Sequence, residues 1–193
     1  MRKSREETAR TRALIVATAA EEFRRTGIGA TGLAGLMNAA GLTHGGFYKH
    51  FASKDQLVTE ACASLMIDVT DSLAQRALKQ PPGERVAWFV NSYLSPRHRD
   101  DAAHGCGLAA LGAELARGTD ETRDVAAQGV KHMVDAIAGL FDPPGGPGAH
   151  ARAQTLTAGL VGAITLARAV NDPALADELL ANTAKTLLAS VAA

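Results

Sequence analysis

Apolar residues recur at helical spacing along most of the chain. Near the N-terminus Ala13, Val16, Ala20 and Phe23 lie three or four residues apart, and Gly27 ends the run. Further runs of this kind follow, separated by segments rich in Gly and Pro. The pattern predicts an all-α protein of about nine helices.

A short helix is predicted directly after Leu42. Thr43 can cap its first turn, and Leu42 and Phe47 are spaced as a hydrophobic staple around that cap. Gly45 and Gly46 lie inside this helix, and each costs about 1 kcal/mol relative to Ala. Because a helix of about two turns with two glycines is not stable by itself, its sequence must serve another purpose.

A second helix start follows at Ser53. Ser53 and Gln56 have the spacing of a capping box. The apolar pattern behind them predicts one helix that continues to about Leu78, before Pro81 and Pro82 end it. Such a helix is long enough to connect an N-terminal unit with the rest of the chain.

Residues 30–41 predict another short helix, closed by Gly41 in a left-handed turn. Together with the helix after Thr43 it has the order of a helix-turn-helix, whose second helix enters the major groove of DNA by its N-terminal residues. In that position Gly45 and Gly46 would let the backbone approach the duplex, with its amide groups toward phosphate.

This segment also resembles a known protein family. The positions that carry the resemblance are Phe23, Gly27, Thr31, Ala40, Gly41, Gly45, Tyr48, His50, Phe51, Ser53 and Lys54. In this order and spacing they are similar to the N-terminal DNA-binding domain of the TetR (tetracycline-repressor-like) regulators. Gly32, Gly35 and Gly46 depart from the pattern of the family. The resemblance implies a three-helix DNA-binding domain over residues 1–52 and an effector-binding and dimerisation domain over residues 53–193.

Eight residues are candidates for contact with DNA: Thr31, Thr43, His44, Gly45, Tyr48, Lys49, His50 and Lys54. His44 can donate to a guanine or to a phosphate, unless it is only an exposed residue beside the cap. Tyr48, Lys49 and His50 follow about one turn later and should face the phosphate backbone, which positions a protein without specifying sequence.

Thr31 and Lys54 lie at predicted helix starts. Thr31 can both cap the first helix of the motif and contact a phosphate. A positive side chain at a helix N-terminus, as at Lys54, is unfavourable for the helix dipole, which suggests that a phosphate is its partner. Phe47 and Phe51 are expected in the core, where they hold the two helices together.

The distribution of charge agrees with one DNA-facing end. The 193 residues carry a formal net charge of zero, which taken alone argues against nucleic acid. Residues 1–54, however, contain nine Lys and Arg against four Asp and Glu. A net charge of +5 on this segment and −5 on the remainder is the asymmetry expected when only one end meets phosphate.

The sequence gives no sign of a metal site, a cofactor or an enzyme. Cys62 and Cys106 are far apart, and the histidines lack the spacing of metal ligands. No nucleophile elbow, Walker loop or dinucleotide fingerprint is present. The N-terminus lacks an apolar signal core, and the longest low-charge stretch, residues 153–167, is too short to cross a membrane. We therefore expect a soluble cytoplasmic protein.

Cys106 allows two interpretations. It lies between Gly105 and Gly107, which would give access to it, and His104 is near enough to lower its pKa, so it could be a thiol that senses oxidants or electrophiles. The alternative is a small buried apolar residue, which a free cysteine usually is. Cys62 lies on an apolar stripe and is expected in the core.

Further helices are predicted over about residues 84–94, 106–117 and 119–141, with a polar loop over residues 97–105. Six residues could line an effector cavity in this body: Met66, Trp88, Phe89, Tyr93, Cys106 and Met133. Core packing is the alternative for each of them, and the sequence does not decide which face a void.

The last two helices, about residues 149–170 and 174–191, are expected to form a dimer interface. Small residues in the first would let another helix approach closely: Gly159, Gly162, Ala163 and Ala167. An apolar ridge in the second consists of Leu180, Leu187 and Val191. Pairing with a second copy would bury this surface in a four-helix interface. The alternative is that the surface covers the protein's own core.

Combined with the resemblance, these features predict a homodimeric transcriptional repressor that a small-molecule effector releases from a palindromic operator. Two other hypotheses stay open. One is a repressor switched through the thiol of Cys106. The other is an enzyme formed by the body helices, although no constellation of acid, base and nucleophile supports it. The sequence does not distinguish repression from activation.

Overall fold

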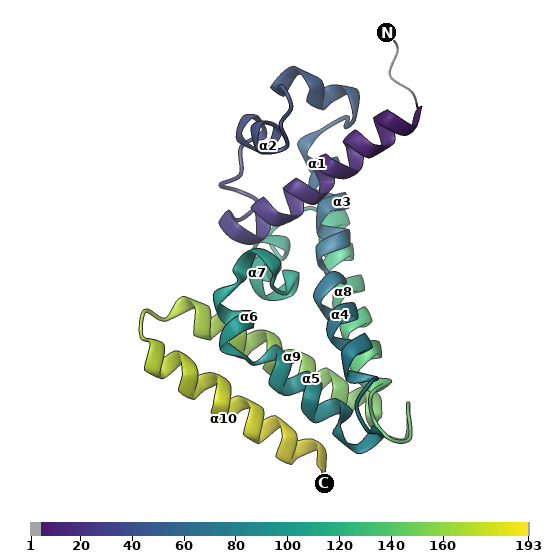
Figure 1. Cartoon of the computed structure of the whole chain (residues 1–193), viewed down its shortest axis with the longest axis vertical. Helices are drawn as coiled ribbons and strands as arrows, with labels where there is room; N and C mark the ends of the chain where they lie inside the picture. Colours follow the sequence, from purple (N-terminus) through teal and green to yellow (C-terminus); the bar gives the residue numbers. More distant parts are fainter. Residues whose placement is uncertain (1–4, 193) are drawn as a thin grey trace.

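The computed structural model describes residues 5–192, and every element in that range is helical (Figure 1). Within the described residues it contains ten α-helices and three 3₁₀-helices. Three elements form a head at one end of the molecule, and α10 lies at the opposite end beside α9. The predicted all-α class is confirmed, with ten α-helices instead of about nine.

The head consists of α1 (Arg5–Thr26), α2 (Leu33–Ala39) and η1 (His44–Lys49). The body consists of α3 (Lys54–Leu65), α4 (Asp68–Ala77), η2 (Pro82–Glu84), α5 (Arg85–Tyr93), α6 (Pro96–Asp100), η3 (Ala102–His104), α7 (Gly107–Leu115), α8 (Asp120–Ala138), α9 (Ala149–Ala169) and α10 (Pro173–Ala192). The segment predicted as a polar loop, residues 97–105, contains α6 and η3, because Ser95 caps α6 by accepting from His98 N–H at 3.3 Å.

Large apolar side chains hold the head together. Phe23 of α1, Leu36 and Met37 of α2 and Phe47 of η1 are each at most 1% exposed. Gly41 has a φ of 69°, and the N–H of Leu42 donates to the carbonyl of Met37 at 2.8 Å. The left-handed turn predicted at Gly41 is therefore confirmed, and it directs the chain from α2 into η1.

Two predicted caps of the motif are wrong in detail. The N-cap of α2 is Gly32, not Thr31, and it makes no side-chain capping bond. Thr43 does occupy the N-cap of η1, but its hydroxyl accepts no hydrogen bond from the first turn. Because both caps lack side-chain bonds, the two short helices depend on packing of their apolar faces.

The helix start at Ser53 is confirmed, but the helix that follows is interrupted. The N–H of Gln56 donates to Ser53 Oγ at 3.1 Å, and Gln56 Oε1 accepts from the N–H of Ala52 at 2.8 Å. The predicted single helix ends at Leu65, and α4 begins at Asp68. The connection to the body is therefore two helices joined at Met66 and Ile67.

Packing explains the interruption. Met66 is 2% exposed and lies against glycines of two other helices, Gly107 of α7 and Gly129 of α8. A Cβ atom at Gly129 would lie 2.7 Å from Met66 Cβ, and one at Gly107 would lie 3.0 Å from Met66 Cε. Only glycine permits this approach, so the bend and the two glycines belong together.

Polar contacts of Arg24 and Gly29 join the head to the body beyond α3. Arg24 of α1 donates through Nη2 to Asp68 Oδ2 of α4 at 2.7 Å and through Nη1 to the carbonyl of Ala103 at 3.3 Å. After α1, the N–H of Gly29 donates to Glu114 of α7 at 3.0 Å. The head is thus tied to α4, η3 and α7.

Candidate DNA-binding surface

The predicted recognition helix is a 3₁₀-helix with one buried and one exposed side. Phe47 is fully buried, and its ring stacks on Phe51 at a centroid distance of 5.4 Å. On the other side Thr43, His44, Gly45 and Lys49 are exposed, and Tyr48 is 63% exposed. Five of the eight predicted DNA residues therefore share one accessible surface, which we call the reading surface: Thr43, His44, Gly45, Tyr48 and Lys49.

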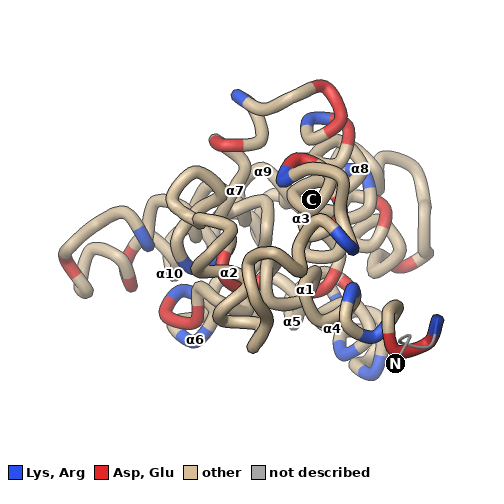
Figure 2. The backbone as a smooth tube through the Cα atoms, turned by 90° about the horizontal axis from the view of Figure 1, so that it is seen from above, with Lys and Arg blue, Asp and Glu red and all other residues tan. Residues whose placement is uncertain are grey.

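The neighbouring α2 contributes no charge to this end of the molecule. It contains neither acidic nor basic residues, and Figure 2, which views the chain from above, shows its backbone uncoloured by charge. Lys49 is the basic residue of η1. The charge that the reading surface offers to phosphate is therefore modest, and no atom lies within 4 Å of the position that a Cβ at Gly45 would take.

Thr31 and Lys54 are occupied within the protein. Thr31 is 6% exposed, and its hydroxyl donates to the carbonyl of Gly27 at 2.7 Å. Lys54 Nζ donates to the carbonyls of Thr31 at 2.7 Å and Ile28 at 3.1 Å. These carbonyls explain a lysine at the start of α3 without a phosphate, because they satisfy two of its three donors.

Arg12, Glu60 and the carbonyl of His50 form an arginine clamp at the C-terminal end of η1, which the sequence did not predict. Arg12 of α1 pairs with both carboxylate oxygens of Glu60 on α3 and donates through Nε to the carbonyl of His50 at 3.3 Å. Its guanidinium also lies 4.5 Å from the ring centroid of Phe51. Because the paired residues are 48 positions apart, no local spacing could have revealed them.

The clamp changes the acidity of its members. The hydrogen bond from Arg12 lowers the pKa of Glu60 below its ordinary value, and the same bond raises the pKa of Arg12. The side chain of His50 is half-buried and is not part of the reading surface. The backbone carbonyl of His50 accepts the hydrogen bond from Arg12. A charged, bidentate pair of this kind holds α1, α3 and the end of η1 in one geometry.

The predicted excess of positive charge on residues 1–54 is only partly offset by acids outside that segment. Arg12 pairs with Glu60 and Arg24 pairs with Asp68, both of the body. Arg10 pairs with Glu6 and Arg25 with Glu22, but these two acids are already included in the net charge of +5. The segment therefore keeps an excess of positive charge after its ion pairs with the body are counted.

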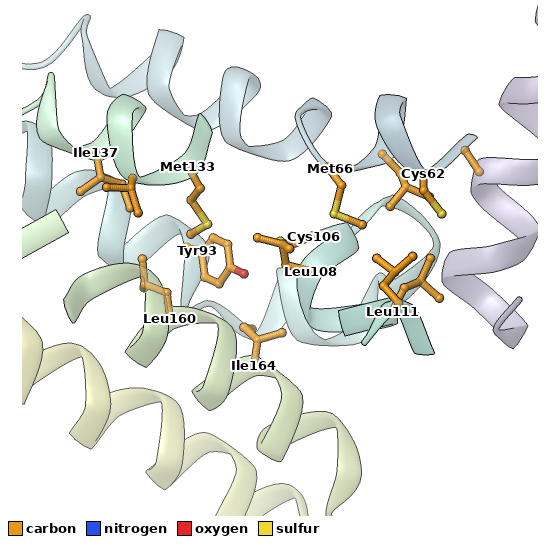
Figure 3. Packing of buried hydrophobic residues seen from close by; sticks show 14 of the residues in the cluster. Cys62, Met66, Tyr93, Cys106, Leu108, Leu111, Met133, Ile137, Leu160 and Ile164 are labelled. Carbon is orange, nitrogen blue, oxygen red and sulfur yellow. The ribbon is translucent and has the colours of Figure 1, made fainter. Parts of the chain in front are cut away.

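In the body, five of the six predicted cavity residues lie in the core. Met66, Phe89, Tyr93, Cys106 and Met133 are each at most 2% exposed. Figure 3 shows the ring of Tyr93 beside Met133, with its hydroxyl pointing toward Cys106 and Leu108. Trp88 lies apart from them, half-buried, with the guanidinium of Arg76 5.3 Å from its ring centroid. The structure brings the five together as a packed cluster.

Two polar groups of this cluster are unusual. The hydroxyl of Tyr93 is buried without a hydrogen-bond partner among the described residues, and burial raises its pKa well above the ordinary value. His98 accepts from the N–H of Cys106 through Nε2 at 3.0 Å, which leaves Nδ1 to donate to the carbonyl of Tyr93 at 2.7 Å. Burial lowers the pKa of His98, in agreement with this neutral tautomer.

The predicted activation of Cys106 by His104 is not supported by the geometry. His104 is exposed and its Nδ1 lies 2.9 Å from Asp101 Oδ1, while Cys106 is 2% exposed. Cys62 is fully buried, which raises its pKa to about 12. Both thiols therefore have the burial of apolar core residues.

Gly159 of α9 faces α10 of the same chain, whereas Gly162 lines a pocket beside α7 and α8. A Cβ at Gly159 would lie 2.8 Å from Leu187, and Ala163 and Ala167 are at most 5% exposed. Leu180 and Leu187 are buried as well, so the predicted outer ridge is wrong for these two residues. The outer surface instead carries Leu166, 56% exposed, and Leu175, 43% exposed. The helical period of the sequence separates one face of each helix from the other, but it does not show which face packs inside the chain and which is exposed.

Over residues 5–192 no group of three or more His, Cys, Asp and Glu side chains could hold a metal ion. In the same part of the chain, no helix combines the length and the apolar character that a membrane span requires.

Comparison with known proteins identifies the N-terminal segment. Residues 15–61 match the family model for bacterial regulatory proteins of the tetR family. The HTH-type transcriptional regulator TtgR and the probable HTH-type transcriptional regulator ArpR, both of Pseudomonas putida, are 36% identical over 75 residues. The match covers 39% of this chain and only 35% of each relative.

Solved structures share the fold of this chain over nearly its whole length. The reduced form of NemR from Escherichia coli has a TM-score of 0.78 at 19% identity, over 92% of this chain and 95% of that one. A TetR transcriptional regulator from Chloroflexus aurantiacus J-10-FL has a TM-score of 0.77 at 22% identity, over 95% of this chain and 96% of that one. The helix-turn-helix segment therefore matches the model of the tetR family, and the chain shares its fold along its length with solved structures of TetR regulators.

Proposed function

We propose that this protein binds duplex DNA through the reading surface and represses transcription from a palindromic operator. The observation that carries the proposal is the exposed side of η1, where His44, Tyr48 and Lys49 project from a helix whose other side is fixed by Phe47 and Phe51. In a helix-turn-helix such a helix reads base edges by its N-terminal residues and phosphates further along.

The chain acts in this proposal as a homodimer through α9 and α10. The exposed Leu166 and Leu175 on these helices support such an interface. Two reading surfaces related by a two-fold axis would meet half-sites spaced by one helical turn of DNA, about 34 Å. The relatives TtgR and ArpR carry the description of HTH-type transcriptional regulators, which agrees with this role.

A small-molecule effector that prefers a conformation with another spacing would release the DNA. The five buried residues around Tyr93 remain a prediction for part of its site, together with Trp88. The unpartnered hydroxyl of Tyr93 supports a ligand there, because a polar group from the ligand would satisfy it. The cluster is packed, so such a ligand would have to displace side chains.

The experiment is fluorescence anisotropy of the full chain on duplex DNA taken from upstream of its own gene. Lys49→Gln should weaken binding to all sequences and reduce the slope of the salt dependence by about 1. His44→Ala should cost about 1–3 kcal/mol on the preferred sequence and less on a scrambled one. Lys79→Gln, an exposed lysine beyond the end of α4, is the matched control and should change nothing.

Equal affinity of the wild type for the natural and the scrambled duplex at moderate salt would reject that operator. The thiol hypothesis can be tested on the same assay with mild oxidant. We expect oxidant to release neither the wild type nor Cys106→Ala, because Cys106 is buried. Release of the wild type alone would instead make Cys106 the sensor.

A further inference from the structure

A pocket of about 580 Å³ lies where the head meets the body, bordered by α1, α4, α5 and α6. One face of α4 forms a wall of it, from Asp68 to Arg76, and Arg24 of α1 is its single contribution from the head. This volume is in the range of small-molecule sites. The pocket borders the buried cluster around Tyr93 at His98, and it contains no residue of the reading surface.

Two arginines in the pocket form no close ion pair. The guanidinium of Arg97 on α6 makes no hydrogen bond or salt bridge among the described residues, although its charge helps to lower the pKa of Asp101 nearby. The guanidinium of Arg76 on α4 lies over Trp88 and likewise lacks an acidic partner in the described chain. Both carboxylates of the pocket are engaged elsewhere, Asp68 with Arg24 and Asp101 with His104. The pocket therefore holds three arginines against two carboxylates, and the guanidiniums of Arg76 and Arg97 are free of close ion pairs and available to a ligand.

The remaining walls are apolar or carry hydroxyl groups. Val69 and Leu73, both half-buried, lie on the face of α4 between the two ends of the pocket. Ser72 and Ser92 add hydroxyls. His98 adds no charge, because its two ring nitrogens are already used by backbone groups of Cys106 and Tyr93. An apolar strip beside guanidinium groups fits a molecule with one anionic group and an apolar portion.

The pocket also contains the tie between head and body. The side chain of Arg24 is only 6% exposed, yet its Nε is buried without a hydrogen-bond partner in the described chain. Its Nη2 bonds to Asp68, which is itself 49% exposed toward the pocket. A negative group that enters here would repel Asp68 and attract Arg24, and so would compete with their ion pair.

We infer that this pocket binds a small organic anion with an apolar portion. The charged group lies between Arg76 and Arg97, and the apolar portion lies along Val69 and Leu73. Binding favours conformations in which Arg24 and Asp68 are separated, so the head is no longer held at one position on the body. The binding step stands by itself, whereas its effect on DNA rests on the proposed function.

Trp88 reports on the pocket, because it is the single tryptophan of the chain and lies 5.3 Å from the guanidinium of Arg76. The probe is 4-phenylbutyrate, titrated at constant ionic strength with excitation of the indole, and calorimetry on the same samples gives a second readout. The neutral 4-phenylbutan-1-ol and inorganic sulfate serve as comparison compounds. We expect saturable binding of 4-phenylbutyrate, at least about tenfold tighter than either of them. The alcohol lacks the charged hydrogen bond, and sulfate lacks the apolar portion.

Arg97→Gln should weaken binding of 4-phenylbutyrate about tenfold, the ratio that corresponds to about 1.4 kcal/mol. Because the guanidinium of Arg97 makes no hydrogen bond or salt bridge in the described fold and acts only at longer range on Asp101, this change should leave folding intact. Arg117→Gln, an exposed arginine after α7, is the matched control and should bind as the wild type does. No binding in either readout, equal binding of the alcohol, or full affinity in Arg97→Gln would overturn the inference.

The effect on DNA is measured separately. In the wild type, saturating 4-phenylbutyrate should weaken operator binding about 5-fold to 150-fold, and in Arg97→Gln the same concentration should do far less. If the compound binds but DNA affinity does not change, the site stands and its coupling to the head is wrong. If the protein does not prefer its own DNA, the proposed function fails, and calorimetry still decides whether the pocket binds the anion.

Discussion

The head and the body reach stability by different means. The head has two very short helices, of seven and six residues, and neither is capped by a side chain. It is held by a few large rings and by one bidentate ion pair between Arg12 and Glu60. The body has helices of up to 21 residues that approach one another closely at glycines. Its stability is spread over many small contacts.

This difference fits the proposed division of the chain into a DNA-binding head and a ligand-binding body. A surface that contacts DNA needs exposed backbone and polar side chains, which leaves few residues for a core. Each core residue of the head therefore contributes a large share of its stability. The body can lose a contact without losing its fold. Buried residues of the two regions nevertheless form one continuous cluster, in which α3 packs on both α1 and α8.

The largest effect is expected from Phe47→Ala. Removing this fully buried ring should cost about 3–5 kcal/mol and unfold the head before the body. In urea, circular dichroism should then show an early loss of helix, while the fluorescence of Trp88 in the body follows a later transition. The control is Leu14→Ala, at a side chain that is 50% exposed, which should change stability by less than about 0.5 kcal/mol.

If both probes of Phe47→Ala shifted together, the head and body would unfold as one unit. The predicted boundary between residues 52 and 53 would then have no thermodynamic meaning.

An intermediate effect is expected in the body at a pair of glycines. Gly129→Ala places a methyl group 2.7 Å from Met66 Cβ and should destabilise the protein by about 1–3 kcal/mol despite the higher helix propensity of Ala. Gly112→Ala has no atom within 4 Å of its new Cβ, and the same gain in propensity should stabilise it by up to about 1 kcal/mol. Urea denaturation of both variants checks this, and a stabilised Gly129→Ala would contradict the packing account.

The smallest effect is expected from the arginine clamp, whose contribution to stability should depend on pH. Hydrogen bonding to Arg12 lowers the pKa of Glu60 in the folded protein below its ordinary value of 4.5. The pair therefore stabilises the fold above about pH 4.5, and this contribution is lost as the pH falls through the lowered pKa. Since both side chains are about one-third exposed, Glu60→Gln should cost at most about 1 kcal/mol, or about 2–4 °C in melting temperature, near pH 7.

Thermal melts of wild type and Glu60→Gln from pH 7 to pH 3.5 would show this difference shrinking in acid. A difference that stayed constant over that range would mean that the pair contributes through packing and not through charge.

Local signals of the sequence predicted local features. The capping box of Ser53 and the left-handed turn at Gly41 depend on neighbouring residues alone, and both are present. The break after Leu65 was not predicted, because the apolar pattern continues through Met66 and its cause lies in Gly107 and Gly129, far along the chain.

The reading surface could be predicted better than its support. Positions 43–49 follow from a motif with fixed spacing, whereas the partners of Arg12 and Lys54 are 48 and 23 residues away. Lys54 shows the limit most clearly. An unfavourable charge at a helix start correctly indicated that a partner was needed, but the partners are backbone carbonyls of the same head.

The bend at Met66 also bears on how such a protein can change over generations. Any side chain larger than hydrogen would press on Leu65 at residue 107 and on Met66 at residue 129. We expect it to alter the angle between α3, which carries the head, and α4, which borders the pocket. Such variants would keep every side chain of the reading surface and of the pocket. A genetic screen for altered induction thresholds should therefore recover substitutions at these two glycines, remote from both surfaces.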